Sequence, residues 1–286
     1  MNPQPSRRSV KIAERMQWSG VIYFLTRISA QQKQMDKKNL LNIRRRTQPR
    51  IHDFCYLHCR SHLRTLESFI NRLYDRSTSN PVVLDVGCGC KPFEERFSEG
   101  HYIGVDIDPD SAADFVLDCN KDSFPTPKDS VDGVILSNTL EHIFDISHLL
   151  AEICRVLKPG GLIYFSVPMT FPVHAHPDDY YRFTPHYFER SFSGWEILQL
   201  NVTNSVFSTP LLWTAQVLET FLPTWITFLP ITLLNSCALL LDHSTKMLFG
   251  LMKANILMRV WSGGPLEING LVRKPHGSKL TEGKLL

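Results

Sequence analysis

Short apolar runs that end at turns or acidic residues recur through the middle of this chain and restrict its fold more than any other feature. Five of them have the length of strands, at residues 82–86, 102–105, 115–117, 131–136 and 162–167. A helical pattern over 146–157 separates the last two, and the Pro-Gly-Gly that follows is expected to end that helix. Strands that alternate with helices predict an α/β fold with a mostly parallel sheet.

The segments on either side of these runs complete the predicted organisation. Residues 52–76 repeat apolar side chains at helical spacing. Two more strands are expected at 196–202 and 266–273, with a long insertion between them. We therefore divide the chain into a basic arm (1–50), a core (51–204), an apolar helical insertion (205–262), and a final strand with a tail (263–286).

Residues suited to binding a nucleotide cofactor stand where successive strands end. A Gly-x-Gly turn at 87–89 follows Asp85, which we expect to face a cationic amino group. Asp106 ends the next strand and can accept hydrogen bonds from both ribose hydroxyls, while Asp118 is placed near the adenine edge. One such acid would suit a helix cap or a turn. Three at successive strand ends favour cofactor binding.

Four segments resemble, in order and in spacing, the motifs of the class I S-adenosylmethionine (SAM) methyltransferases. They are residues 83–89 (VLDVGCG), 102–107 (YIGVDI), 131–143 (VDGVILSNTLEHI) and 155–161 (RVLKPGG). The resemblance implies a Rossmann-like, doubly wound sheet of seven strands, the last one antiparallel, and SAM as the cofactor. The cofactor-binding residues expected from it are Asp85, Gly87, Cys88, Gly89, Asp106, Ile107, Asp118 and Asn138.

Lys91 departs from the pattern of that family, in which many members carry a third glycine at this position. The run at 90–93 (CKPF) resembles a poorly characterised branch of the family, similar to the type 11 methyltransferases, that tolerates the change. We expect Lys91 to alter the approach to the methionine carboxylate of SAM, for instance by pairing with it.

The segment after the fifth strand supplies the candidate catalytic residues. Residues 168–184 (PMTFPVHAHPDDYYRFT) resemble the same branch and are expected to lie over the methyl-donor end of the site. An oxygen acceptor must lose its proton, and His174, His176 and Asp179 are candidates to take it. Arg182 could orient an acidic group of the substrate or hold Asp179. The alternative is that Asp179 and Arg182 form a structural pair that fastens this loop.

Two groups of residues have the chemistry of metal ligands, but we predict no metal site. Glu141 and His142 resemble part of the divalent-metal site of ubiquinone-biosynthesis O-methyltransferases. Asn138 stands where those enzymes carry a further acid, which weakens the metal hypothesis in favour of helix capping or cofactor support. A second group falls on one face of the predicted helix at 52–76: His52, Cys55, Cys59 and His62. Four residues spread over about 15 Å of a straight helix do not surround one tetrahedral ion, so burial of this face is favoured.

The insertion at 205–262 is unusually apolar. Residues 220–241 form an uncharged run of 22, long enough to span a bilayer. Pro223 and Pro230 are expected to interrupt it, and the final strand must return to the sheet. We therefore favour contact with the membrane surface, with 246–261 as an interfacial helix. The alternatives are a lid over the site or a dimer interface.

The first 50 residues are strongly basic. They hold 12 Lys and Arg but only two acids, and Arg44, Arg45, Arg46 and Arg50 form the densest cluster. The favoured interpretation is a solvated, partly disordered leader, and the alternative is attraction to an anionic membrane or nucleic acid. Nucleic acid is not expected, because neither a base-flipping motif nor aromatics interleaved with the basic cluster are found. Seven cysteines, two of them in the glycine turn, suit a reducing cytoplasm.

These features together predict a cytoplasmic SAM-dependent methyltransferase, peripheral at the membrane. The expected substrate is an amphiphilic small molecule, such as a lipid, a quinone or a lipid-linked glycan, methylated at oxygen. A noncatalytic SAM-binding or membrane-associated scaffold is the main alternative, but it would not need the polar residues after the fifth strand. An NAD oxidoreductase would need a third glycine where Pro92 stands.

Overall fold

A seven-stranded sheet with the order β3-β2-β1-β4-β5-β7-β6 forms the centre of the computed structural model, which describes residues 37–76, 80–251 and 266–276. β7 runs antiparallel to both neighbours, while the other pairings are parallel. The doubly wound fold predicted from the sequence is thereby confirmed. The strands are β1 (Val82–Val86), β2 (His101–Asp106), β3 (Phe115–Val116), β4 (Val131–Ser137), β5 (Leu157–Pro168), β6 (Glu196–Thr203) and β7 (Glu267–Arg273).

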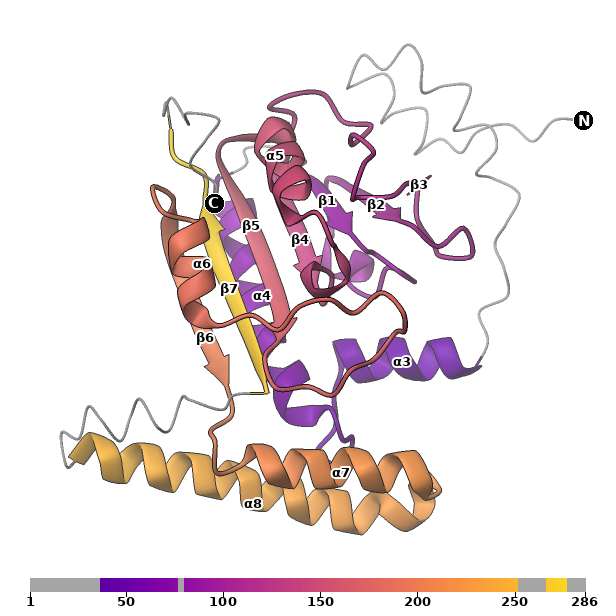
Figure 1. Cartoon of the computed structure of the whole chain (residues 1–286), viewed down its shortest axis with the longest axis vertical. Helices are drawn as coiled ribbons and strands as arrows, with labels where there is room; N and C mark the ends of the chain where they lie inside the picture. The colour runs from indigo at the N-terminus through magenta and orange to yellow at the C-terminus, as the bar shows by residue number, and fades with distance from the viewer. Residues whose placement is uncertain (1–36, 77–79, 252–265, 277–286) are drawn as a thin grey trace, which may run out of the picture.

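Helices cover both faces of the sheet (Figure 1). α4 (Tyr56–Arg76) packs on one face, and α5 (Ile146–Val156) and α6 (Pro185–Ser191) pack on the other. Successive strand residues point to opposite faces, so Ile135 contributes to the α4 side while Val134 contributes to the α5 side. This alternation gives the central strands two buried faces and explains their nearly continuous apolar sequences.

Three local features differ from the sequence-based expectation. Residues 159–161, expected to form a turn, lie inside β5, whose register with β4 shifts there. Between β1 and β2 the structure has a 3-10 turn, η2 (Glu94–Arg96), in place of a full helix. Pro230 lies inside a continuous helix and does not interrupt it. The missing hydrogen bond of a proline is tolerated because the helix lies at the surface, where water can replace it.

The part of the basic arm that the structure describes is folded onto the core. It forms α3 (Lys37–Thr47), whose Arg44 guanidinium donates two hydrogen bonds of 2.6 Å to Asp53. Arg45 forms an ion pair with Glu219. The densest basic cluster is thus partly neutralised within the protein, whereas a solvated leader was expected. Residues 1–36 lie outside the described residues.

The insertion before β7 contains a hairpin of two helices, α7 (Thr209–Phe221) and α8 (Thr224–Leu251), with Pro223 in the turn between them. The hairpin lies along one end of the sheet (Figure 1). Its inner side packs on the start of α4, and Asn235 donates hydrogen bonds to the backbone oxygens of Ile51 and Asp53, at 2.7 and 3.0 Å. Part of the predicted interfacial helix, residues 252–261, lies outside the described residues.

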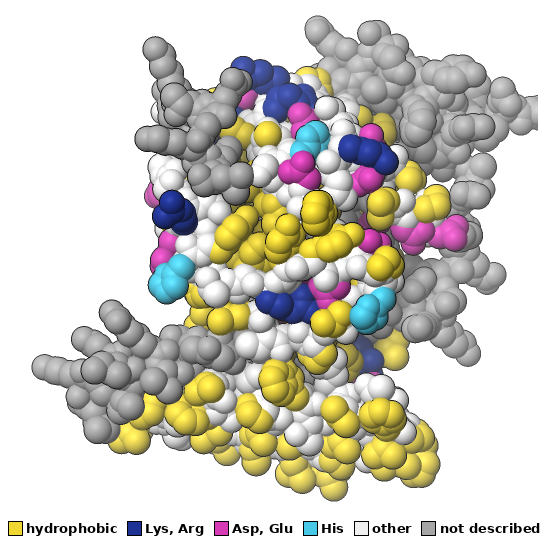
Figure 2. All heavy atoms as spheres, viewed as in Figure 1, with side chains coloured by type: hydrophobic (Ala, Val, Ile, Leu, Met, Phe, Trp, Pro, Cys, Tyr) yellow, Lys and Arg dark blue, Asp and Glu magenta, His cyan; other side chains and the backbone are white. Residues whose placement is uncertain are grey.

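The outer side of this hairpin is apolar and exposed. Figure 2 shows hydrophobic side chains along the edge that the two helices form. Within α8, Trp225–Phe249 is long and apolar enough to cross a membrane and contains an 18-residue stretch with a mean hydropathy of 1.5, although a core helix can also have this composition. Only 22% of that stretch is buried, so α8 is not a core helix.

Candidate functional site

The glycine turn after β1 leaves room for a ligand. Gly87 and Gly89 have φ of +69° and +51°, in the left-handed region that favours glycine. A Cβ on Gly87 would lie 2.7 Å from the Thr139 hydroxyl, whereas a Cβ on Gly89 would meet nothing within 4 Å. Cys88 is buried between them. The backbone at Gly89 therefore borders open space, where a ligand can approach closely.

Asp106, at the end of β2, is tied to this turn. Its Oδ2 accepts the backbone N–H of Gly89 at 2.8 Å, and its Oδ1 accepts the N–H of Asp108 at 2.9 Å. Ile107 follows with 64% of its surface exposed, an apolar surface beside the carboxylate. The glycine turn and Asp106, which is expected to bind the ribose, are thus adjacent and fixed relative to each other.

Asp85 lies below the turn in a buried position. The Tyr102 hydroxyl donates a hydrogen bond to its carboxylate, and only 2% of the residue is exposed. Burial raises the pKa of Asp85 to about 7. A cationic group at the turn would favour the charged form of Asp85, which is consistent with the predicted role toward an amino group.

Lys91 occupies a different position from the one expected. Its Nζ lies 2.6 Å from Asp114 Oδ2, and its side chain is only 9% exposed. Gly104 makes this possible, because a Cβ there would lie 2.5 Å from Lys91 Cε. Lys91 therefore stabilises the turn from within, and its charge is already paired.

Asp118 and Asn138 lie at the same edge of the sheet. Asp118 Oδ1 accepts the backbone N–H of Asn120 at 3.0 Å and its side-chain N–H at 2.9 Å. The backbone hydrogen bond is the main reason that the pKa of Asp118 is lowered. Asn138 has φ of +51° and donates its backbone N–H to Ser166 at 2.9 Å. Asn138 also lines the cavity described next.

A cavity of about 430 Å³ opens beyond the carboxyl ends of β4 and β5. In open α/β sheets this is the edge at which ligands bind. The start of α4 forms one wall, α3 contributes Arg45 and Arg46, and the segment after β5 forms the opposite wall. The residues that give the cavity its polar character are Arg45, Arg46, His58, His62, Asn138, Glu141, His142, His174 and Glu267.

Glu141, His142 and His174 form a titratable group in this cavity, with ligand atoms within 4.8 Å of one another. Glu141 is fully buried, its carboxylate oxygens make no hydrogen bond, and burial raises its pKa to about 8. The His142 and His174 rings meet edge to face, with centroids 5.0 Å apart. His174 Nδ1 lies 3.1 Å from the carbonyl oxygen of Pro172. If that nitrogen carries the proton, Nε2 is free to accept another.

Asp179 and Arg182 fasten the loop that carries His174. Arg182 donates two hydrogen bonds to Asp179, at 2.6 and 2.8 Å, and the Asp179 side chain is only 1% exposed. The other three N–H groups of Arg182 donate to backbone oxygens of Phe171, Pro172 and Tyr181. Asp179 in turn accepts the backbone N–H of His174 at 2.8 Å. All five donors of Arg182 are used within the protein, which favours the structural interpretation of this pair.

Comparison with known proteins places this site in a family. A model of the methyltransferase domain matches residues 56–208, slightly more than half of the chain. The chain belongs to this methyltransferase family. The order of the strands and the glycine turn described above fit a class I SAM-dependent methyltransferase domain.

Individual relatives match a shorter part of the methyltransferase. An uncharacterized methyltransferase of Mycolicibacterium gilvum is 35% identical over 102 residues, which cover 32% of this chain and 40% of the relative. A ubiquinone biosynthesis O-methyltransferase of Hydrogenovibrio crunogenus is 27% identical over 106 residues, covering 32% and 44%. The chain thus spans less than half the length of these curated relatives. A SAM-dependent methyltransferase from Archaeoglobus fulgidus has a TM-score of 0.45 and 16% identity, covering 84% of this chain and all of the other.

SAM, the cofactor of this methyltransferase family, fits the residues at the turn. Gly89 leaves the space that the methionine part requires, and Asp106 places a carboxylate beside it for the ribose hydroxyls. The exposed Ile107 offers an apolar surface to the adenine. Asp118 and Asn138 lie farther along the same edge, and their roles stay predictions.

The acceptor side of the methyltransferase differs in detail from the sequence-based hypothesis. His174 and Glu141 face one cavity, but His176 is exposed and is not among the residues that line it. The pKa of Asp179 is held well below its usual range by Arg182, so this carboxylate is a weak proton acceptor. The sequence favoured helix capping or cofactor support for Glu141 and His142, with a metal site as the weaker hypothesis, and did not place them on the acceptor side. The signal that could identify them as acceptor-side residues is their position immediately after β4.

Replacing Arg182 with Ala is expected to destabilise the folded methyltransferase by about 2–4 kcal/mol, because the buried Asp179 carboxylate would lose its partner. Urea unfolding at pH 7 would measure this, with the exposed Arg190→Ala on α6 as the control. Because the folded-state pKa of Asp179 is lowered, the pair stabilises the fold above pH ~4 and this contribution is lost at lower pH. Equal urea midpoints for the two variants would contradict a structural role for the pair.

Proposed function

We propose that this protein transfers a methyl group from SAM to an oxygen atom of an amphiphilic small molecule at a membrane surface. The observation that carries the proposal is a cavity of about 430 Å³ that contains His174 and Glu141 and lies beside the apolar α7–α8 hairpin. Phe171 and Leu266 line this cavity and also pack in the cluster that attaches the hairpin. A substrate partly embedded in a lipid surface at the hairpin would have a short path to the cavity.

The residues of the cavity suit an acceptor that must lose a proton. Bound SAM supplies an activated methyl group, so the protein contributes position and proton removal. His174, with Nδ1 directed to the Pro172 carbonyl, can take the proton of a hydroxyl through Nε2. Glu141, with its pKa raised to about 8, is mostly protonated at pH 7 and can donate a hydrogen bond to the acceptor oxygen. A methyl acceptor that reacts through oxygen would use both the proton acceptor His174 and the hydrogen-bond donor Glu141.

The partner that we assign to the hairpin is a lipid bilayer surface. Its most exposed large side chains are Phe221 (79%) and Trp225 (81%), which lie at the turn between the two helices. Leu229, Leu233 and Leu240 continue the apolar side with at least 56% exposure each. Trp and Phe at the end of an uncharged segment favour the interface between water and lipid. A soluble monomer rarely exposes so many large apolar side chains on one surface.

The double variant Phe221→Glu/Trp225→Glu is expected to lower binding to vesicles at least tenfold, because it removes two inserted aromatic rings and adds two charges. Co-sedimentation with phosphatidylcholine vesicles containing phosphatidylglycerol would measure the change. Val116→Glu, on exposed β3 away from the hairpin, is the control. Equal sedimentation of wild type and double variant, or a wild-type dimer that does not bind vesicles, would contradict the lipid assignment.

Methyl transfer itself is tested with SAM labelled in its methyl group and a fractionated lipid extract. The expected result is label in a chloroform-soluble product that forms only with the folded protein. If the protein binds SAM but labels no lipid, quinone or glycolipid fraction, the noncatalytic SAM-binding alternative is favoured. If label appears only in a water-soluble product, the reaction stands and the amphiphilic acceptor is wrong.

A further inference from the structure

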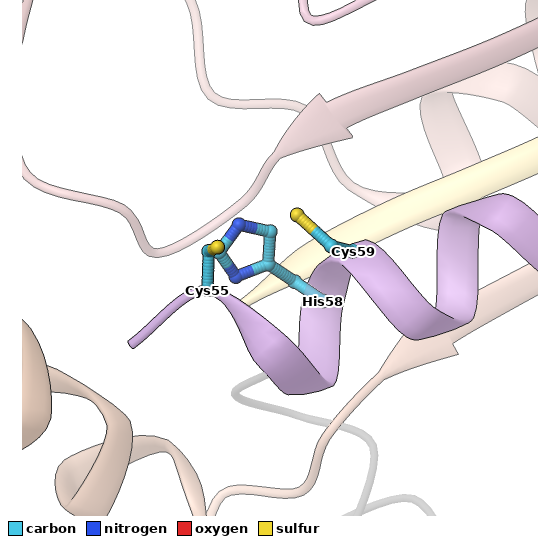
Figure 3. A group of neighbouring side chains, drawn as sticks. All are labelled: Cys55, His58 and Cys59. Atoms are coloured by element: carbon cyan, nitrogen blue, oxygen red, sulfur yellow. The ribbon is translucent and has the colours of Figure 1, made fainter. Parts of the chain in front are cut away.

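The start of α4 presents two cysteines and a histidine to the acceptor cavity. Cys55 precedes the helix, and His58 and Cys59 lie in its first turn, three and four residues later. Residues with this spacing share one face of a helix. Figure 3 shows the three side chains projecting to the same side, and their ligand atoms lie within 4.8 Å of one another.

This group differs from the four residues that the sequence analysis considered as metal ligands, which were His52, Cys55, Cys59 and His62. His52 packs against Phe228 of α8, with ring centroids 4.5 Å apart and the rings tilted, and so takes no part. His58, which that hypothesis left out, lies between the two cysteines in sequence and space. The objection to four ligands spread along a straight helix does not apply to three ligands within one turn.

Buried polar atoms near this group lack hydrogen-bonding partners. His58 Nδ1 is buried and makes no hydrogen bond. His62, one turn farther along α4, is only 2% exposed, and neither of its ring nitrogens makes a hydrogen bond. Its Nδ1 lies 3.4 Å from Oε1 of Glu267, which is itself buried without a hydrogen bond. Unsatisfied buried groups are costly, and all of these residues line the same cavity.

The cavity holds basic and acidic side chains together, so a neutral metal unit suits it better than an isolated charge. Glu267 and Glu141 are both buried there, and neither Glu141 oxygen makes a hydrogen bond. A divalent cation bound by two thiolates and one imidazole forms a neutral unit, so placing it in the cavity carries little of the penalty of an isolated charge.

The chemistry of the three ligand atoms indicates which metal is expected. Two thiolate sulfurs and one imidazole nitrogen suit Zn²⁺, which prefers four ligands in tetrahedral geometry. With Zn–S bonds of ~2.3 Å, two sulfurs of a tetrahedral site lie ~3.8 Å apart. Ligand atoms that already lie within 4.8 Å of one another therefore need to move by about 1 Å or less.

We propose that Cys55, His58 and Cys59 bind one Zn²⁺ ion whose fourth coordination position is open to the acceptor cavity. Three protein ligands with one open position are the pattern of catalytic zinc sites, whereas structural sites are closed by four. The open position would take the oxygen atom of an acceptor such as an alcohol or a phenol. That part rests on the proposed function, and the metal site itself does not.

The first test measures metal content of the full chain purified without chelator. We expect about one zinc per chain in the wild type and at least ~100-fold weaker zinc binding in Cys55→Ser and in Cys59→Ser. Cys237→Ser, which changes an exposed cysteine on α8, is the matched control and should keep its zinc. His58→Ala serves as a further variant if the cysteine variants do not fold, and it should also lose zinc.

The second test examines the open position by replacing zinc with Co²⁺. A tetrahedral cobalt–thiolate site gives intense visible and near-ultraviolet absorption, and azide should shift these bands if one position is open. A wild type that binds SAM but retains no zinc after addition of the metal would overturn the site. Zinc that survives in Cys59→Ser would show that the assigned ligands are wrong. A cobalt spectrum unaffected by azide would show that the fourth position is not open. None of these measurements depends on methyl transfer.

Discussion

Replacing Asp106 with Ala is expected to weaken SAM binding by about 100-fold or more at pH 7. The carboxylate is placed to accept both ribose hydroxyls, and a hydrogen bond to a charged group contributes ~1.5–3 kcal/mol. The same change leaves the Gly89 N–H without its partner at 2.8 Å, so the glycine turn loses part of its preorganisation. Calorimetric titration with SAM and with S-adenosylhomocysteine measures the combined loss of affinity.

Two further variants separate the contributions of charge and structure at this position. Asp75→Ala removes the same charge at the far end of α4 and should leave SAM affinity unchanged. Asp106→Asn keeps the size and one acceptor atom but loses the charge, so we expect an intermediate affinity. If Asp106→Ala binds SAM within threefold of wild type while folded, the cofactor does not use this strand end, and the site assigned to it is wrong.

The fold and the cofactor turn were accessible from the sequence because their signals are local. The central strands are nearly continuous apolar runs, since they are buried on both faces, and residues predicted to bind the cofactor stand at or near the ends of these runs. Gly87 and Gly89 are needed where they stand because their backbone has positive φ. The order of such elements predicts the parallel part of the sheet, whereas the antiparallel last strand was expected only from the resemblance to the methyltransferase family.

The parts that could not be predicted depend on contacts distant in sequence. Lys91 was expected to face the cofactor, but it pairs with Asp114, 23 residues away, in space left by Gly104. Arg45 was expected in a solvated arm, but it forms an ion pair with Glu219 of α7. A single sequence gives the charge of such residues but not their partners.

The grouping of residues around the acceptor cavity could not be predicted from the sequence for the same reason. Nothing in the spacing of Cys55, His58 and Cys59 indicates that Glu141 and Glu267 share a cavity with them. That proximity follows from packing the start of α4 against the end of β4 and the start of β7. His176 and His174 look equivalent in sequence, but the loop fastened by Arg182 directs only His174 into the cavity.

Replacing His174 with Ala is expected to lower kcat for methyl transfer by about 10²–10⁴-fold, the usual contribution of a general base. SAM affinity should remain within about threefold, because His174 lies on the acceptor side and makes no contact with the glycine turn. His186→Ala, an exposed histidine on α6, is the matched control. Rates at saturating SAM, together with SAM titrations of each variant, separate the chemical step from cofactor binding.

Glu141→Gln distinguishes the base from its neighbour in the cavity. Burial raises the pKa of Glu141 to about 8, so at pH 7 the wild-type side chain is mostly a neutral hydrogen-bond donor. Gln is also neutral and a donor, so kcat at pH 7 should fall by less than about tenfold if His174 is the base. If Glu141 is the base instead, its charged form is required, wild-type activity rises as the pH increases through about 8, and Glu141→Gln loses activity at every pH. A His174→Ala enzyme that keeps kcat while Glu141→Gln loses it would therefore transfer the role of base to Glu141.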